Sequence, residues 1–187
     1  MQSYNPTRLA HQLLESKLSN AECAIDATAG NGKDTLFIAC NTPKNAIVWA
    51  FDIQEAAITN TKEVLTNHGY ENKVKLICDN HANIGAYIHE AIDVAMFNLG
   101  YLPGAPHDIT TQTQSTIAAL RQVLNLLSVG GAISLIAYIG HLAGQYEHQE
   151  VRKLLSSLPA DSFTVGCWEI INHNKNSPIL YVVEKVR

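Results

Sequence analysis

Asp26-Ala27-Thr28-Ala29-Gly30-Asn31-Gly32-Lys33-Asp34 is the segment around which the rest of this chain can be organised. The apolar run 23–25 precedes it and the apolar stretch 36–39 follows it, which is typical of a strand, a tight turn and the beginning of a helix. Gly30 and Gly32 let the turn run tightly, with its backbone N–H groups open to a ligand. The segment therefore predicts a ligand site between a strand and a helix.

Two further acids support a site of this kind. Asp52 lies near the end of the next predicted strand, 47–53, where a carboxylate can accept hydrogen bonds from both hydroxyls of a ribose. Asp79 ends the strand after that, 74–79. Because ligands of parallel sheets bind outside the carboxyl ends of the strands, these acidic strand ends predict a nucleoside-containing ligand.

Length and composition indicate one α/β domain spanning residues 1–187. Hydrophobic residues make up 47% of the chain and charged residues 16%, which supplies a core and excludes general disorder. The most apolar run, 132–139, is far shorter than the ~20 residues of a membrane helix. Residues 1–6 lack the pattern of a signal peptide. We therefore expect a cytoplasmic protein without a membrane partner.

Cysteine usage and net charge further narrow the class of protein. The four cysteines are scattered without a CxxC pair, so neither a zinc site nor a disulfide framework is expected, and no metal is assigned; they are Cys23, Cys40, Cys78 and Cys167. The net charge of −4 argues against strong nonspecific binding to nucleic acid, which depends on the neutralisation of phosphates. A small basic patch remains compatible with this charge.

The order of the predicted elements gives the fold class. A helix at about 7–19 carries leucines at helical spacing, with Thr7 as its cap. Strands then alternate with helices, and the glycine pair 130–131 breaks the chain before the fifth strand. The predicted strands are 23–28, 47–53, 74–79, 92–99, 132–139, 163–171 and 179–186, and the predicted helices between them are 33–40, 55–68, 83–89, 113–127 and 145–158. This order predicts a Rossmann-like, doubly wound, mostly parallel seven-stranded sheet with one antiparallel edge strand, because no helix separates the last two strands.

Two nucleoside cofactors compete for such a site. A dinucleotide site requires G-x-G-x-x-G, whose third glycine packs the helix on the strand, and that glycine is absent here. Asp26 and Asp34 would repel a pyrophosphate, whereas S-adenosylmethionine (SAM) carries positive sulfonium and ammonium groups. Coulomb attraction of ~1–4 kcal/mol per close pair favours acids beside such cations. The segment therefore favours SAM over NAD.

Several segments together resemble one family of enzymes. They are Asp26–Thr35, Phe51–Gln54, Asn98–Gly104, Thr110-Thr111 with Ser115-Thr116, and Tyr138–His141. On these segments the chain resembles a class I SAM-dependent methyltransferase. It is most similar to the family first labelled rRNA methylases and now understood as bacterial methyltransferases of the aminomethyl group on the tRNA wobble uridine. The Asn98–Gly104 and Tyr138–His141 motifs are the more selective part of this resemblance.

The resemblance implies a set of cofactor contacts. Asn31, Gly32 and Asp34 would line the methionine half of SAM. Asp52 would hold the ribose, and Asn80 and His81 would lie beside the adenine. The implied cofactor-binding residues are Asp26, Thr28, Gly30, Asn31, Gly32, Asp34, Asp52, Gln54, Asp79, Asn80, His81 and Asn98.

Asn98-Leu99-Gly100-Tyr101 matches, in part, the Asn-Pro-Pro-Tyr motif of methyltransferases that act on amino groups. In that motif the Asn carbonyl and a backbone carbonyl accept hydrogen bonds from the amine and aim its lone pair at the methyl group. Both motif prolines are missing, so the match favours a nitrogen acceptor but does not carry over the rigid turn. The implied catalytic residues are Asn98, Tyr101, Pro103 and His107, and the implied substrate-binding residues are Tyr101, Tyr138, Gly140 and His141.

The function implied by the resemblance is N-methylation of tRNA at the wobble uridine, with the anticodon stem-loop as partner. Methylation of rRNA or of a small-molecule amine stays open as an alternative, and a NAD-dependent oxidoreductase is less favoured. RNA contact is expected through Arg121, Arg152 and Lys153 or across a homodimer. The proton acceptor stays open among His107, Asp108 and His141, because no spacing selects one. The remaining histidines are expected at the surface; they are His11, His68, His89, His148 and His173.

Overall fold

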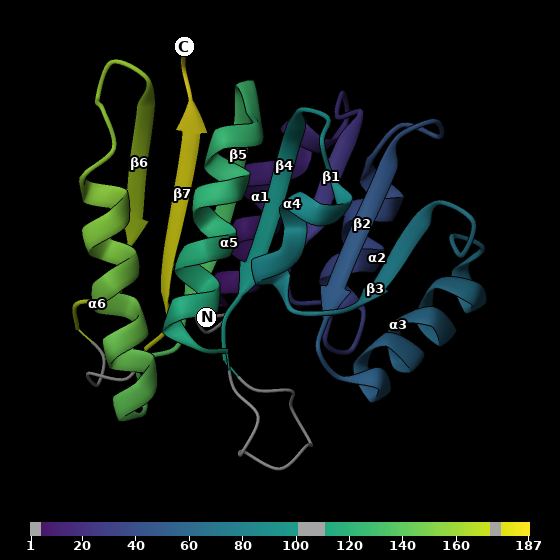
Figure 1. Ribbon diagram of the computed structural model, residues 1–187, viewed down its shortest axis with the longest axis horizontal. Helices are drawn as coiled ribbons and strands as arrows, with labels where there is room; N and C mark the ends of the chain where they lie inside the picture. The colour runs from purple at the N-terminus through teal and green to yellow at the C-terminus, as the bar shows by residue number, and fades with distance from the viewer. Residues whose placement is uncertain (1–4, 101–110, 173–176) are drawn as a thin grey trace.

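The computed structural model describes residues 5–100, 111–172 and 177–187. In these residues the strands form a seven-stranded sheet in the order β3-β2-β1-β4-β5-β7-β6 (Figure 1). The strands are β1 (Cys23–Asp26), β2 (Ile47–Asp52), β3 (Val74–Cys78), β4 (Ile92–Asn98), β5 (Leu127–Ala137), β6 (Phe163–Trp168) and β7 (Ile179–Lys185). The helices are α1 (Pro6–Leu18), α2 (Lys33–Asn41), α3 (Glu55–His68), α4 (Ile84–Tyr87), α5 (Thr113–Leu126) and α6 (Leu142–Ser156), with a 3₁₀ turn η1 (His81–Asn83) before α4.

The predicted fold class is confirmed, and the structure locates its antiparallel strand. β7 pairs antiparallel with both β5 and β6 and lies between them, so β6 forms the edge. The apolar run at 179–183 is almost wholly buried, as suits an inner strand, whereas β6 exposes Val165 and Trp168. The last strand of the chain is therefore inserted one position in from the edge.

Three local predictions were wrong. The cap of α1 is Asn5 and not Thr7: its side chain accepts the Arg8 N–H at 3.0 Å, and a proline occupies the first turn. β5 begins at Leu127 and therefore contains the glycine pair. Its pairing with β4 shifts in register between Ile92 and Val94, and Gly130 accommodates the irregularity with a φ of 82°. α6 begins at Leu142 and not at Gln145.

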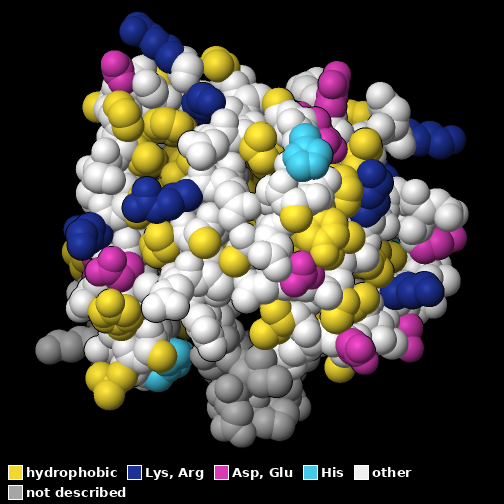
Figure 2. All heavy atoms as spheres, viewed as in Figure 1, with side chains coloured by type: hydrophobic (Ala, Val, Ile, Leu, Met, Phe, Trp, Pro, Cys, Tyr) yellow, Lys and Arg dark blue, Asp and Glu magenta, His cyan; other side chains and the backbone are white. Residues whose placement is uncertain are grey.

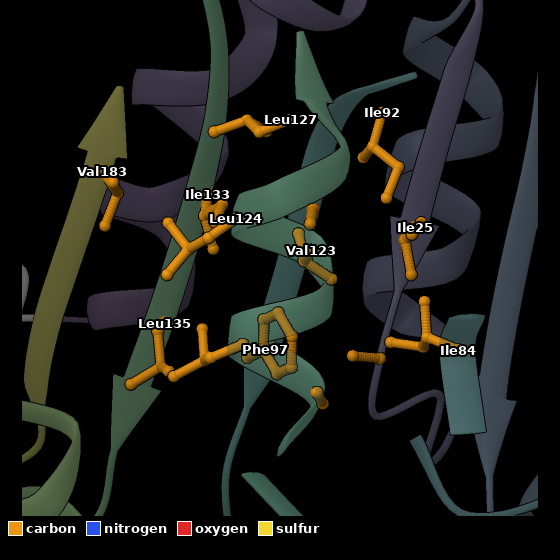
Figure 3. Close-up of a cluster of buried hydrophobic side chains, with 14 of the residues drawn as sticks. Ile25, Ile84, Ile92, Phe97, Val123, Leu124, Leu127, Ile133, Leu135 and Val183 are labelled. Carbon is orange, nitrogen blue, oxygen red and sulfur yellow. The ribbon is translucent and has the colours of Figure 1, made fainter. Parts of the chain in front are cut away.

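Two helical layers cover the sheet (Figure 1). α4, α5 and α6 pack on one face, where a buried apolar cluster includes Ile25, Phe97 and Leu135 (Figures 1 and 3). α1, α2 and α3 pack on the other face, against a cluster that includes Leu14, Ile38 and Leu65. Burial on both faces explains why the central strands read as continuous apolar runs.

Sheet register brings the functional candidates to one edge. Asp26 pairs with Ala50 and Met96 in the parallel ladder, so β1, β2 and β4 finish side by side. Asp52 and Asn98, each the last residue of its strand, therefore lie at the same edge as the glycine loop after Asp26.

Candidate active site

The loop between β1 and α2 uses its two glycines differently. Gly30 has a φ of 52° and Gly32 a φ of 77°, a region that glycine enters at little cost. A Cβ on Gly32 would lie 2.9 Å from the Cα of Thr61 in α3. Gly32 therefore allows α3 to approach the loop, and it does not line the cavity described below.

Asp52 joins β2 to this loop. One carboxylate oxygen accepts the Gly30 N–H at 2.9 Å, and the other accepts the Gln54 N–H at 3.0 Å. These bonds fix the carboxylate, and each oxygen retains a second lone pair. Asp52 and Gln54 both line the cavity, where a sugar hydroxyl can reach those lone pairs.

Asp26 lies behind the cavity wall. Its carboxyl group is fully buried and accepts the Thr28 N–H at 3.0 Å and the Thr35 hydroxyl at 2.6 Å. Burial, reinforced by the charge of Asp34, raises the pKa of Asp26 to about 7. Asp26 therefore holds the loop through these hydrogen bonds and does not itself line the cavity.

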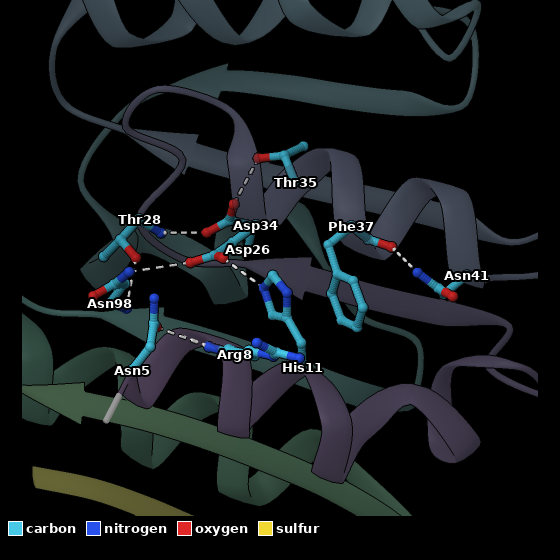
Figure 4. A network of polar contacts seen from close by, with 10 residues as sticks. All are labelled: Asn5, Arg8, His11, Asp26, Thr28, Asp34, Thr35, Phe37, Asn41 and Asn98. Carbon is cyan, nitrogen blue, oxygen red and sulfur yellow. Dashed lines mark hydrogen bonds and ion pairs between the residues drawn. The ribbon is translucent and has the colours of Figure 1, made fainter. Parts of the chain in front are cut away.

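A polar chain runs from α1 to the end of β4 through Asp34 (Figure 4). His11 Nε2 lies 2.7 Å from one Asp34 carboxylate oxygen, and the Asn98 side-chain amide donates to the other at 3.1 Å. The His11 ring stacks on Phe37 of α2, with centroids 3.7 Å apart and planes 1° from parallel. The expectation that His11 is a plain surface residue was wrong, since it lies half-buried behind a cavity residue.

Asn98 is fixed through both its backbone and its side chain. Its N–H donates to the Thr28 hydroxyl at 2.7 Å, and its side-chain nitrogen is committed to Asp34. Within the described part of the chain no donor reaches its side-chain oxygen. Because Asn98 lines the cavity, that oxygen is the acceptor it offers there.

His81 lines the cavity and carries a buried acceptor. The side chain is 7% exposed, and Nδ1 lies 3.1 Å from the Ala27 carbonyl oxygen. Burial lowers the pKa of His81, which favours the neutral ring. The carbonyl oxygen beside Nδ1 can only accept, so the ring proton is on Nδ1. Nε2 is then an acceptor, and it is buried without a partner among the described residues.

Asp79 and Asn80 both line the cavity after β3 but bond mainly to their own turn. The pKa of Asp79 is held low by hydrogen bonds from the Asn83 amide at 3.0 Å, the Asn80 N–H at 2.7 Å and the Tyr87 hydroxyl at 2.9 Å. The Asn80 side chain accepts the Ala82 N–H at 2.9 Å and so caps η1.

A buried acid, Glu147, fixes Thr111 in the wall of the cavity. Gly100 and Thr111 exchange two hydrogen bonds: the Gly100 N–H donates to the Thr111 hydroxyl at 3.0 Å, and the Thr111 N–H donates to the Gly100 carbonyl at 2.9 Å. The Thr111 and Thr116 hydroxyls donate to the Glu147 carboxylate at 2.9 and 2.7 Å. Burial raises the pKa of Glu147. Glu147 was missed by the sequence analysis, because a glutamate within an amphipathic helix carries no local signal of burial.

These groups surround a cavity of about 590 Å³ at the carboxyl ends of the strands. The predicted residues that line it are Thr28, Gly30, Asn31, Asp34, Asp52, Gln54, Asp79, Asn80, His81, Asn98 and Tyr138. The structure does not bring Asp26, Gly32, Gly140 or His141 into the lining, and it adds Lys33, Thr111, Gln112 and Ser115. His141 instead caps α6, with its Nδ1 accepting the Gly144 N–H at 3.0 Å. Tyr101, Pro103 and His107 lie outside the described residues.

The lining suits SAM. Asp34 and Asp52 place negative charge beside the glycine loop, where it attracts a sulfonium or an ammonium group. The unpartnered Nε2 of His81 is a buried acceptor in the wall of the same cavity. Across the described ranges no helix is long and apolar enough to span a membrane. In the same ranges the His, Cys, Asp and Glu side chains form no group suited to a metal ion.

The comparison with known proteins supports a SAM site of this kind. A "putative methyltransferase" from Streptococcus mutans, solved in complex with SAH, superposes with a TM-score of 0.89 at 36% identity, covering 98% of this chain and 99% of that one. A "putative rRNA-methylase" from Clostridium thermocellum gives a TM-score of 0.95 at 36% identity, covering 99% and 100% of the two chains. The fold and the site thus define a SAM-dependent methyltransferase.

The family is equally clear. The family model described as "Putative rRNA methylase" matches residues 48–184, and the chain belongs to this family. A curated relative, the chloroplastic "tRNA (mnm(5)s(2)U34)-methyltransferase" of Arabidopsis thaliana, is 36% identical over 176 residues. That match covers 89% of this chain, and the chain spans 64% of the length of that relative.

Proposed function

We propose that the chain is an N-methyltransferase of tRNA that acts on the aminomethyl group of 5-aminomethyl-2-thiouridine at the wobble position, giving 5-methylaminomethyl-2-thiouridine. The observation that carries the proposal is Asn98. Its side-chain nitrogen is held by Asp34 at 3.1 Å, so its oxygen is the atom offered to the cavity. An amine that donates to this oxygen is held with its lone pair free for attack.

SAM, when bound, supplies an electrophilic methyl group on a sulfonium that is a good leaving group. The residues of the chain then have three tasks. Asp52 and His81 hold the nucleoside end, Asp34 supplies negative charge beside the loop, and Asn98 orients the incoming amine. The amine must reach the site as the free base, because an ammonium group has no lone pair. Positioning of this kind contributes to the rate by holding nitrogen and methyl carbon at contact distance.

The substrate rests on the named relative and not on surface charge. The relative from Arabidopsis is named for modified uridine 34 of tRNA, and this chain is 36% identical to it. Figure 2 shows the Lys and Arg side chains of one face scattered and not gathered into a single patch. Arg121, Arg152 and Lys153 are all exposed, as RNA contact through them would require.

Methyl transfer onto defined RNA tests the proposal. The purified chain is incubated with methyl-labelled SAM and bulk tRNA that retains the unmethylated aminomethyl uridine, followed by digestion and nucleoside mass analysis. We expect label in 5-methylaminomethyl-2-thiouridine. Parallel reactions with rRNA and with a pool of small amines distinguish the alternatives: label in either, with none in tRNA, contradicts the proposal. Thermal stabilisation by NAD but not by SAM would also overturn the assignment of SAM as the cofactor.

A further inference from the structure

We propose that His11 is a positioning residue of the methyl transfer, acting through Asp34 to fix the side-chain amide of Asn98 so that its oxygen faces the acceptor amine. The inference rests on the proposed N-methyl transfer and adds a residue from α1, outside the strand ends that form the cavity wall. His11 does not line the cavity. Its contribution therefore passes through the carboxylate between it and Asn98.

The geometry is that of a single hydrogen-bonded line. Asp34 lies between His11 at 2.7 Å and the Asn98 amide at 3.1 Å, and a different carboxylate oxygen serves each neighbour (Figure 4). The Asp34 side chain is 8% exposed and that of His11 is 24% exposed. The hydrogen-bonded line therefore runs from the cavity toward the solvent at α1. Both ends are anchored, because Phe37 fixes the imidazole plane and Thr28 fixes the Asn98 backbone.

The direction of each bond follows from the chemistry of the groups. An ionised carboxylate only accepts hydrogen bonds, so Nε2 of His11 and Nδ2 of Asn98 must both donate to Asp34. The Asn98 oxygen then has to point away from Asp34. A freely rotating carboxylate would hold the amide less firmly, and an amide turned by 180° would present a donor to the amine in place of an acceptor. His11 removes that freedom.

Kinetics with three variants test the assignment. His11→Ala is expected to lower kcat for tRNA by about tenfold or more, with little change in the dissociation constant of SAM. His11→Gln, whose amide can also donate to Asp34, is expected to recover part of that loss. The matched control is His68→Ala, which removes an exposed helical histidine bonded to the Val64 carbonyl and should leave kcat unchanged. If His11→Ala weakens SAM binding and kcat equally, the positioning role is wrong.

A double-mutant cycle shows whether His11 acts through Asn98. Single-turnover rates are measured for His11→Ala in the wild-type and in the Asn98→Ala background. We expect the His11 effect to vanish when Asn98 is absent. An equal effect in both backgrounds overturns the proposed route.

A spectroscopic measurement separates this inference from the substrate assignment. In ¹⁵N–¹H spectra the side-chain amide of Asn98 is identified by its loss in Asn98→Ala. One amide proton should lie downfield in the wild type and return toward the free-amide position in His11→Ala, but not in His68→Ala. An unchanged amide in His11→Ala overturns the inference even if tRNA is methylated. A shifted amide in a chain that does not methylate tRNA overturns the proposed function alone.

Discussion

The carboxylate of Asp52 accepts the backbone N–H of Gly30 at 2.9 Å and so ties the end of β2 to the glycine loop that follows β1. The same residue lines the cavity, so one side chain both shapes the loop and borders the cavity. Asp52→Ala removes both effects. We expect SAM binding to weaken by about 1–3 kcal/mol, the scale of a lost charge-assisted hydrogen bond.

Calorimetric titration of SAM measures this loss. Asp52→Asn is the matched control, because it keeps one acceptor oxygen without the charge and should lose less affinity than the alanine variant. An unchanged affinity in Asp52→Ala would remove Asp52 from the ribose site.

Asn98→Ala separates catalysis from cofactor binding. The oxygen proposed to orient the amine is lost, while the carboxylates and His81, which are proposed to hold the cofactor, are retained. We expect turnover on tRNA to fall by about 10²-fold with SAM affinity nearly unchanged. Asn67→Ala, at an exposed position of α3, is the control and should behave as the wild type. Parallel losses of SAM affinity and turnover would speak against the orienting role.

His81→Phe tests the orphan acceptor in the cavity wall. Phenylalanine preserves an aromatic ring against Phe97, whose ring centroid lies 6.2 Å away, and deletes Nε2 together with the Nδ1 contact to the Ala27 carbonyl oxygen. We expect SAM and SAH to lose similar affinity, about 1 kcal/mol each, because both carry the same adenine. Binding titrations of the two ligands measure the loss, and undiminished affinity for both would show that Nε2 does not contact the adenine.

Gly32→Ala and Gly69→Ala form a matched pair for stability. The two glycines have φ values of 77° and 75°, so alanine strains the backbone equally at either site, by about 1–2 kcal/mol. At Gly69 a Cβ meets nothing within 4 Å, whereas at Gly32 it would lie 2.9 Å from the Cα of Thr61. Gly32→Ala should therefore lower the free energy of unfolding more than Gly69→Ala does. Equal losses of unfolding free energy in urea denaturation would mean that the loop and α3 move apart at little energetic cost.

Asp26 makes stability depend on pH. Its pKa is raised from 3.8 to about 7 in the folded chain, so the protonated carboxyl stabilises the fold fully below 3.8, and this contribution is lost as the pH rises through about 7. Asp26→Asn removes the group that must ionise in a buried place. Relative to the wild type, its free energy of unfolding should improve by up to about 2.6 kcal/mol between pH 5 and pH 8.

Urea denaturation at the two pH values measures this change. Asp161→Asn, at an exposed position, is the control and should show no such trend. A difference between Asp26→Asn and the wild type that does not vary with pH would place the folded-state pKa of Asp26 near its ordinary value.

The sequence predicted those parts of the site that are local in the chain. The strand, glycine turn and helix at 23–40 follow from apolar periodicity and turn chemistry, and the predicted bounds of α3 coincide with those observed. Asp52 and Asn98 were found because the end of a parallel strand is a defined position on the sheet. Each of these predictions needed only neighbours in sequence and the order of the elements.

The parts that were missed depend on contacts between distant segments. His11 meets Asp34 across 23 positions, and no pattern within α1 distinguishes its inward side chain from an exposed one. The Glu147 pair with Thr111 spans 36 positions and needs α6 to be docked on α5. The insertion of β7 between β5 and β6 likewise depends on strand pairing between distant segments, which forms only when the sheet assembles.

The anchoring of α1 has a consequence for the order of assembly during synthesis. α1 precedes every strand in the chain, yet it packs on β4, β5 and β7, and Lys17 reaches Glu184 at 2.6 Å and the Gly130 carbonyl at 3.0 Å. All three strands under this helix are therefore present only once the chain has been made through β7. Since α1 also delivers His11, a chain that stops before β7 lacks part of the surface that holds His11 beside Asp34.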